Sequence, residues 1–99
     1  MRQWRFEITD NGEADITKLD SSVRRRILKK LKWFMDNFEN VIPLPLGGPL
    51  KGFFKLRIGD WRVIYEAEEE KGLVTVHSID HRNKIYKIFK RRYFKNSSL

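Results

Sequence analysis

The 99-residue sequence has no cysteine, only two histidines and only three prolines. The absence of cysteine excludes disulfides, zinc–thiolate centres and cysteine nucleophiles, and it fits a reducing compartment. No apolar run approaches the ~20 residues of a membrane-spanning helix. Residues 1–8 alternate in polarity and lack the apolar core of a signal peptide. We therefore expect a cytoplasmic protein with no membrane segment.

Positive charge is the main compositional feature, with 21 Lys and Arg against 13 Asp and Glu and a net charge of +8. Such an excess favours a polyanionic partner. Nucleic acid is the first candidate, an acidic protein the second and a membrane surface a weaker third. The length fits one domain, at residues 1–95, followed by a frayed tail at 96–99.

The stretch Lys55–Tyr65 has the pattern of a β-hairpin, because apolar runs flank Gly59-Asp60 and glycine suits the tight turn. Side chains of a strand alternate between its two faces. The apolar face would hold Leu56, Ile58, Trp61, Val63 and Tyr65, and the other face Lys55, Arg57 and Arg62. Arg57 and Arg62 would oppose each other, which costs stability. An anion site and a solvated basic face remain equally open at this point.

The rest of the chain alternates between helical and extended patterns. We expect, in order, a strand at 2–8, helices at about 13–19 and 22–38, a loop at 40–49, strands at 51–58, 61–67 and 73–80, and a helix at 84–92. The helix at 22–38 has an apolar stripe that we expect to pack in the core: Val23, Ile27, Leu31, Phe34, Met35 and Phe38. Its opposite side is basic and reads as a solvated face or a phosphate-contacting surface.

A second group of candidate residues follows the last strand, and a meander can bring that strand's end near the hairpin. Lysine, arginine, histidine and tyrosine together can bind a phosphodiester and stabilise a pentacoordinate phosphorus. RNA supplies its own nucleophile, the 2′-hydroxyl, so this chemistry needs an acid, a base and cations but no metal. His81 is the natural acid, because histidine is the residue type whose ordinary pKa lies closest to neutral pH. Lys55 is either the base or a phosphate ligand, and Tyr86 stacks on a base, orients the phosphate or simply packs.

Two other kinds of site fit less well. His77, Asp80 and His81 suggest a metal centre, but four residues along a strand span about 13 Å, too far to share one ion. Ser78 lacks the glycine-framed elbow of a serine hydrolase. The acidic run Glu66–Glu70 reads as a solvated turn.

The chain resembles the RelE/ParE superfamily of toxins from bacterial and archaeal toxin–antitoxin pairs. Three stretches carry the resemblance: Lys18–Leu31, the hairpin Lys55–Tyr65, and Ile79–Tyr86. It implies an α+β fold, with a small, mainly antiparallel sheet of about four strands, two N-terminal helices packed on it and a short C-terminal helix.

The RelE branch, which the cationic residues favour, implies a ribosome-dependent, metal-free endoribonuclease without a cofactor that cuts messenger RNA in the ribosomal A site. By position, Lys55 matches a catalytic lysine, Arg62 the arginine that stabilises the transition state, and Arg82 a second active-site arginine. Tyr86 matches the C-terminal tyrosine, and His81 stands just before the second arginine. Predicted RNA contacts come from Lys51, Arg57 and Lys84.

One position departs from the RelE pattern, because Phe53 stands where some RelE proteins carry another lysine. Lys51 takes the place of that lysine only if the start of the predicted strand at 51–58 is irregular. The resemblance also implies a cognate antitoxin, as well as messenger and ribosomal RNA, as partners. Two alternatives stay open: a ParE-like toxin that inhibits DNA gyrase without cutting RNA, and a non-enzymatic RNA- or ribosome-binding module.

Overall fold

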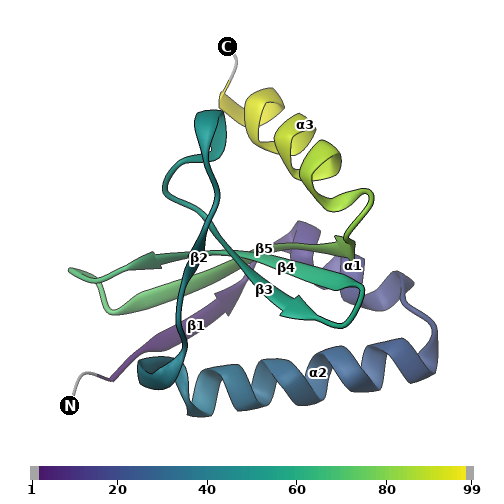
Figure 1. The fold of residues 1–99 in the computed structure, drawn as a ribbon, viewed down its shortest axis with the longest axis horizontal. Coiled ribbons are helices and arrows are strands. Elements are labelled where there is room, and N and C mark those ends of the chain that lie inside the picture. The colour runs from purple at the N-terminus through teal and green to yellow at the C-terminus, as the bar shows by residue number, and fades with distance from the viewer. Residues whose placement is uncertain (1–2, 98–99) are drawn as a thin grey trace.

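The computed structural model describes the backbone of residues 3–97 and the side chains of residues 3–95. Its elements are β1 (Arg5–Ile8), α1 (Asp10–Lys18), α2 (Ser21–Asp36), β2 (Leu44–Pro45), β3 (Phe54–Ile58), β4 (Trp61–Glu68), β5 (Leu73–His81) and α3 (Ile85–Ser97). The strands form one sheet in the order β1-β5-β4-β3-β2 (Figure 1). β1 runs parallel to β5, and the other neighbours are antiparallel. The predicted α+β fold with a mainly antiparallel sheet is confirmed.

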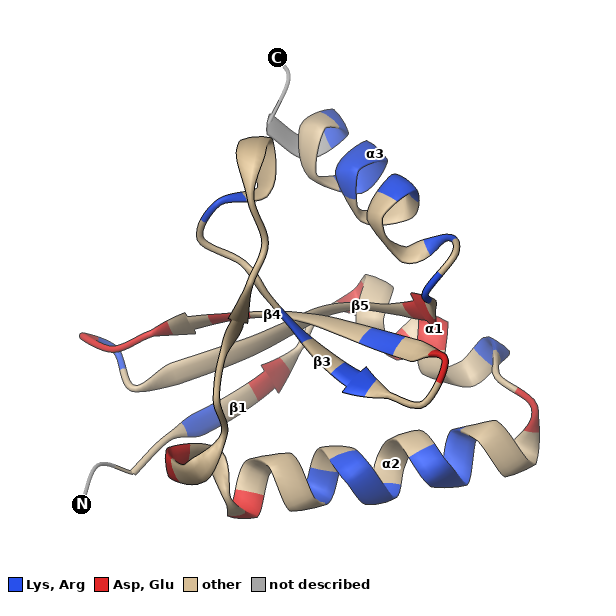
Figure 2. Cartoon of the chain, in the orientation of Figure 1, with Lys and Arg blue, Asp and Glu red and all other residues tan. Residues whose placement is uncertain are grey.

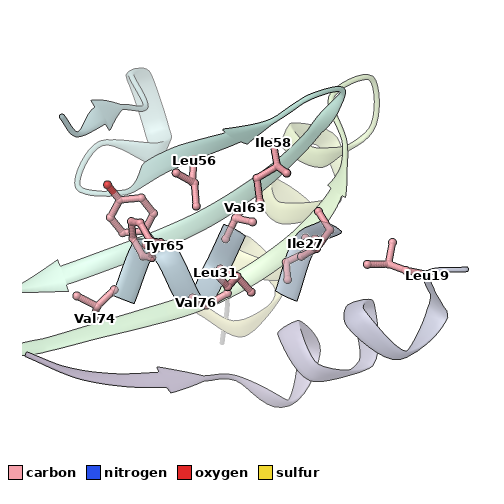
Figure 3. Close-up of a cluster of buried hydrophobic side chains, with 11 residues drawn as sticks. Leu19, Ile27, Leu31, Leu56, Ile58, Val63, Tyr65, Val74 and Val76 are labelled. Carbon is pink, nitrogen blue, oxygen red and sulfur yellow. The ribbon is translucent and has the colours of Figure 1, made fainter. Parts of the chain in front are cut away.

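Helices cover both faces of the sheet, with α2 below it and α3 above it in Figure 1. The core under α2 joins residues of that helix to the sheet (Figure 3): Leu19, Ile27, Leu31, Phe34, Leu56, Ile58, Val63, Tyr65, Val74, Val76 and Ile79. A second, smaller core lies under α3: Leu46, Leu50, Phe53, Ile64, Ile85 and Phe89. None of the described helices is both long and apolar enough to cross a membrane.

The hairpin forms with the predicted register. Ile58 pairs with Trp61, and Arg57 pairs with Arg62. Gly59 has a φ of 59°, which is the left-handed conformation that the turn requires of glycine. Its predicted apolar face packs in or against the core under α2. The hairpin therefore anchors one face of the sheet and leaves its basic side chains on the face of α3.

The first helix begins earlier than predicted. The Thr9 hydroxyl accepts a 3.1 Å hydrogen bond from the Gly12 N–H, so Thr9 caps a helix that starts at Asp10. The predicted start at about 13 is too late because Thr-Asp-Asn-Gly is made of residue types that favour both turns and helix starts. Gly12 also lies close to the sheet, where an added Cβ would stand 2.8 Å from Cγ2 of Ile8.

Four other expectations are corrected. Met35 is 42% exposed rather than in the core, because α2 buries the face formed by Ile27, Leu31 and Phe34. The predicted loop at 40–49 contains β2, which gives the sheet a fifth strand. β3 begins at 54 rather than 51. α3 continues to 97, so the first two residues of the predicted tail are helical, and 98–99 lie outside the described residues.

Candidate active site

Lys55 and Tyr86 line one cavity of about 280 Å³ on the α3 side of the sheet. Lys55 comes from β3 and Tyr86 from the first turn of α3. The Lys55 ammonium nitrogen lies 5.8 Å from the centre of the Tyr86 ring. The segment around β2 supplies further lining: Pro45, Leu46, Gly47, Pro49 and Leu50. Two predicted site residues that are distant in sequence therefore share one hollow.

Lys90 also lines this cavity and was not among the predicted site residues. It follows Tyr86 by four residues, so both side chains stand on one face of α3. Helical spacing alone could have identified it. The same helix buries Ile85 and Phe89 in the second core. Packing of that core therefore fixes how far Tyr86 and Lys90 stand from β3.

Arg57 and Arg62 lie on the same face of the sheet as Lys55. Lys55 pairs with Ile64, which is buried under α3, and the alternation of β4 puts Arg62 on that face too. Nη1 of Arg62 donates hydrogen bonds of 2.7 Å and 2.9 Å to the carbonyl oxygens of Gly59 and Trp61. The Arg62 guanidinium is therefore held at the hairpin turn.

Arg82 is tied to the same turn from the other end of the chain. Its backbone N–H donates a 2.8 Å hydrogen bond to the Asp60 carbonyl oxygen. Its Nε lies 3.7 Å from the Asp60 carboxylate in an exposed ion pair. The turn thus gathers Arg62 and Arg82, while the cavity gathers Lys55 and Tyr86. Figure 2 shows Lys and Arg on β3, β4 and the start of α3.

His81 points elsewhere. It pairs with Trp61, whose side chain packs against the core under α2, and the two ring centres are 5.6 Å apart. Its Nδ1 accepts a 3.2 Å hydrogen bond from the Asn83 N–H. The ring of His81 therefore lies on the sheet face opposite Lys55.

The remaining predicted residues do not line the cavity. Lys51 and Lys84 are exposed. Lys51 precedes β3 in a turn with Gly52, whose φ is 102°. The start of the strand is therefore irregular, which is the condition for Lys51 to take the place of the lysine that is missing at position 53. Phe53 is buried, and its ring centre lies 4.9 Å from that of Phe89. Position 53 therefore belongs to the core under α3.

A buried ion pair joins α1 to α3, although no local sequence pattern predicts it. The two oxygens of Asp15 each accept a 2.9 Å hydrogen bond from the Arg92 guanidinium. Asp15 also accepts from the Ile79 N–H at 2.9 Å, and Arg92 donates to the Ser78 hydroxyl at 3.0 Å. The hydrogen bonds to Asp15 raise the pKa of Arg92 above its usual value. Ser78, which lacks the motif of a serine nucleophile, is fully buried in this network.

Metal-ligand candidates do not converge in the part of the chain that the structure describes. No group of three or more His, Asp or Glu residues stands close enough to hold an ion there. His77 instead lies 3.1 Å from the Glu66 carboxylate, through Nε2, and against the ring of Phe53.

Residues 6–86 match the family described as the ParE toxin of the type II toxin–antitoxin system parDE. The chain belongs to this toxin family. The resemblance to RelE/ParE toxins is therefore confirmed over most of the chain. No curated protein matches the toxin in sequence.

Solved structures of both branches share the toxin's fold. The RelBE2 toxin–antitoxin complex of Mycobacterium tuberculosis matches with a TM-score of 0.69 and 22% identity, over 80% of this chain and 98% of that chain. The isolated RelE toxin of E. coli gives 0.64 and 22%, over 79% and 83%. The chromosomal ParDE system of P. aeruginosa gives 0.65 and 13%, over 82% and 98%. Because one fold serves RelE and ParE proteins, the activity has to be argued from side chains.

Proposed function

We propose that this toxin is a metal-free, ribosome-dependent endoribonuclease that cleaves messenger RNA in the A site. The observation that carries the proposal is the shared cavity of Lys55, Tyr86 and Lys90, on the sheet face that also holds Arg57 and Arg62. A hollow with two ammonium groups and a phenol ring fits a phosphate and its neighbouring base. The family match supports the broader statement that the chain is a toxin.

In the proposed reaction the 2′-hydroxyl of the RNA attacks the adjacent phosphorus. The bond to the 5′-oxygen breaks, which leaves a 2′,3′-cyclic phosphate and a 5′-hydroxyl. Lys55 binds the phosphate or takes the proton of the 2′-hydroxyl, and Arg62 and Arg82 stabilise the charge on the pentacoordinate phosphorus. The Tyr86 ring stacks on an unpaired base. His81, the predicted acid, would have to leave the sheet face that it shares with Trp61 in order to protonate the leaving 5′-oxygen, and otherwise water supplies that proton.

Other cations would bind the RNA backbone without choosing a sequence. Lys51, Arg57 and Lys84 keep that proposed role. A cognate antitoxin with an acidic or amphipathic segment would neutralise the toxin in the cytoplasm. Two of the similar structures are described as complexes of RelE proteins with RelB, which supports such a partner.

Inhibition of DNA gyrase is the second candidate, because the matching family is described by its ParE toxins. The nuclease is favoured by the retained set of Lys55, Arg62, Arg82 and Tyr86. A non-enzymatic RNA-binding module would bind through the same cations but leave messages intact.

Mapping the 5′ ends of cellular messages after controlled expression tests the proposal. We expect in-frame cuts within translated regions, which the Arg62→Ala variant abolishes. The Lys71→Ala variant is the matched control, because Lys71 pairs with Glu68 at the far end of β4. If the messages stay intact and gyrase is stalled on broken DNA, the toxin is a gyrase inhibitor and the nuclease proposal is wrong. If the messages stay intact and the toxin still binds RNA, the chain is a non-enzymatic RNA-binding module.

A further inference from the structure

The cavity that holds Tyr86 has a charged part and an apolar part. Its charged residues are two lysines, Lys55 from β3 and Lys90 from α3. The apolar part comes from the 45–50 segment, which contributes aliphatic residues and one glycine: Pro45, Leu46, Gly47, Pro49 and Leu50. Figure 1 shows this segment on the same side of the sheet as α3. A ligand that fills the cavity therefore needs an anionic group beside an apolar one.

The 45–50 segment is fixed on both sides of Gly47. Leu46 and Leu50 are both buried in the core under α3. The Leu46 N–H donates a 2.9 Å hydrogen bond to the Phe53 carbonyl oxygen, and the Leu50 N–H donates a 3.1 Å hydrogen bond to the Gly47 carbonyl oxygen. This part of the cavity lining is therefore formed before a ligand arrives, which lowers the cost of binding.

The fold does not require glycine at position 47. Its φ of −109° and ψ of −175° are extended values that any residue adopts. Apart from its two neighbours in the chain, no heavy atom of the described residues lies within 4 Å of the place where a Cβ would stand. Gly48 differs, because its φ of 56° lies in the left-handed region that favours glycine. The missing side chain of Gly47 thus leaves open space at the cavity without serving the backbone.

We propose that Gly47 determines specificity, because the space beside it admits a purine base of the message. This inference rests on the nuclease function proposed above and names the base that the same site prefers. The phosphate would lie at Lys55 and Lys90, and the base between Tyr86 and the 45–50 segment. The favourable free energy of burial grows with the apolar area covered, so a double ring gains more on this lining than a single ring. Glycine allows the base to approach the backbone closely.

Equilibrium binding tests the inference separately from cleavage. The ¹⁵N-labelled full chain is titrated with adenosine 5′-monophosphate and with cytidine 5′-monophosphate, and the backbone N–H signal of residue 47 is followed by NMR. Inorganic phosphate at the same concentration corrects for shifts that the anion alone causes. We expect saturable shifts with both nucleotides, and an affinity for the purine nucleotide that is about tenfold higher.

Gly47→Ala adds one methyl group where the purine would lie. It should weaken purine binding about tenfold and change pyrimidine binding by less than about twofold. The matched control is Ile42→Val, which changes one methyl group on a side chain that is 82% exposed and lies outside the cavity. This variant should keep both affinities. A thermal midpoint equal to that of the wild type shows that Gly47→Ala remains folded.

Cleavage on stalled ribosomes gives the second readout, with A-site codons that differ by one exchange of a purine for a pyrimidine. At one codon position the wild type should cut the purine codon about tenfold faster, and Gly47→Ala should remove this preference. Equal affinities of the wild type for the two nucleotides, or a Gly47→Ala variant that keeps the purine preference, would overturn the inference and leave the nuclease proposal standing. If messages stay intact while residue 47 still responds selectively to the purine nucleotide, the nuclease proposal is wrong and the purine site at Gly47 remains.

Discussion

Asp15 and Arg92 stand 77 residues apart in the sequence and form a bidentate ion pair with two hydrogen bonds of 2.9 Å. The pair ties α3, which carries Tyr86, to α1 at the edge of the sheet. Asp15 is only 7% exposed, so the hydrogen bonds from Arg92 replace water around its carboxylate. The position of Tyr86 in the proposed active site therefore depends on α1 through this ion pair.

Breaking this pair should destabilise the toxin strongly. Arg92→Ala leaves a buried carboxylate without its cation, and we expect a loss of about 3 kcal/mol in the free energy of unfolding. The matched control is Lys32→Ala, which breaks an exposed pair with Asp36 and should cost less than about 1 kcal/mol. Urea denaturation measures both. Adding Asp15→Leu to Arg92→Ala should recover part of the loss, and equal costs for Arg92→Ala and Lys32→Ala would contradict a structural role for the pair.

Restoring the lysine that some RelE proteins carry at position 53 should unfold this toxin rather than activate it. Phe53 is 6% exposed, and its ring centre lies 4.9 Å from that of Phe89 and 5.1 Å from that of Tyr93. Truncating such a ring costs about 3–5 kcal/mol, and a buried ammonium adds to the loss. Phe53→Leu keeps the site apolar and should cost only about 1 kcal/mol. A Phe53→Lys protein with wild-type thermal stability and faster cleavage would show that the position is part of the active site.

The hairpin and the long helix were predictable because their signals are local. Alternation and the Gly59 turn fixed the register of β3 and β4, and the three- and four-residue spacing found Ile27, Leu31 and Phe34. Met35 shows the limit of that pattern, since spacing defines a stripe but not its edges. β2 has only two residues, and its pairing with β3 depends on the tertiary fold. A short strand of this kind carries too little periodicity to be recognised.

Part of the site was also beyond the reach of the sequence. Alternation put Lys55 and Arg62 on one face of the hairpin, and the resemblance to known toxins assigned roles to these two residues, Arg82 and Tyr86. Their grouping at a cavity and a turn needed coordinates. Lys90 was missed although its spacing from Tyr86 is helical. Alternation alone could not place His81 on the face opposite Lys55, because that placement depends on the register of β4 and β5, which is irregular at Ile64 and Tyr65.

Tyr65 should make the toxin sensitive to alkaline pH. Burial raises the pKa of Tyr65 to about 12, whereas an unfolded tyrosine titrates near pH ~10. The folded state therefore holds the proton more tightly, and this contribution to stability is complete below about pH 10 and is lost as the pH rises through about 12. Tyr65→Phe lacks the group, so above about pH 10 the wild type should lose unfolding free energy relative to the variant. A difference independent of pH would contradict the burial of a titrating phenol.

Tyr86 should act through its ring more than through its hydroxyl, because the Lys55 ammonium faces the ring. Stacking of a base on an aromatic side chain contributes about 1–3 kcal/mol. We therefore expect Tyr86→Ala to slow cleavage by about 10-fold to 100-fold, and Tyr86→Phe to stay within about 10-fold of the wild type. Single-turnover rates on programmed ribosomes measure both. If the two variants lose the same cleavage rate, the phenol oxygen of Tyr86, and not its ring, carries the function.

Cleavage of a defined message by the purified toxin, on ribosomes stalled with an empty A site, tests the central claim most directly. The account predicts a 2′,3′-cyclic phosphate product in the A-site codon, no product when that nucleotide is 2′-deoxy, and a loss of about 100-fold or more in Arg62→Ala. Cleavage of the 2′-deoxy message, or an intact ribose message with active toxin bound, would contradict it.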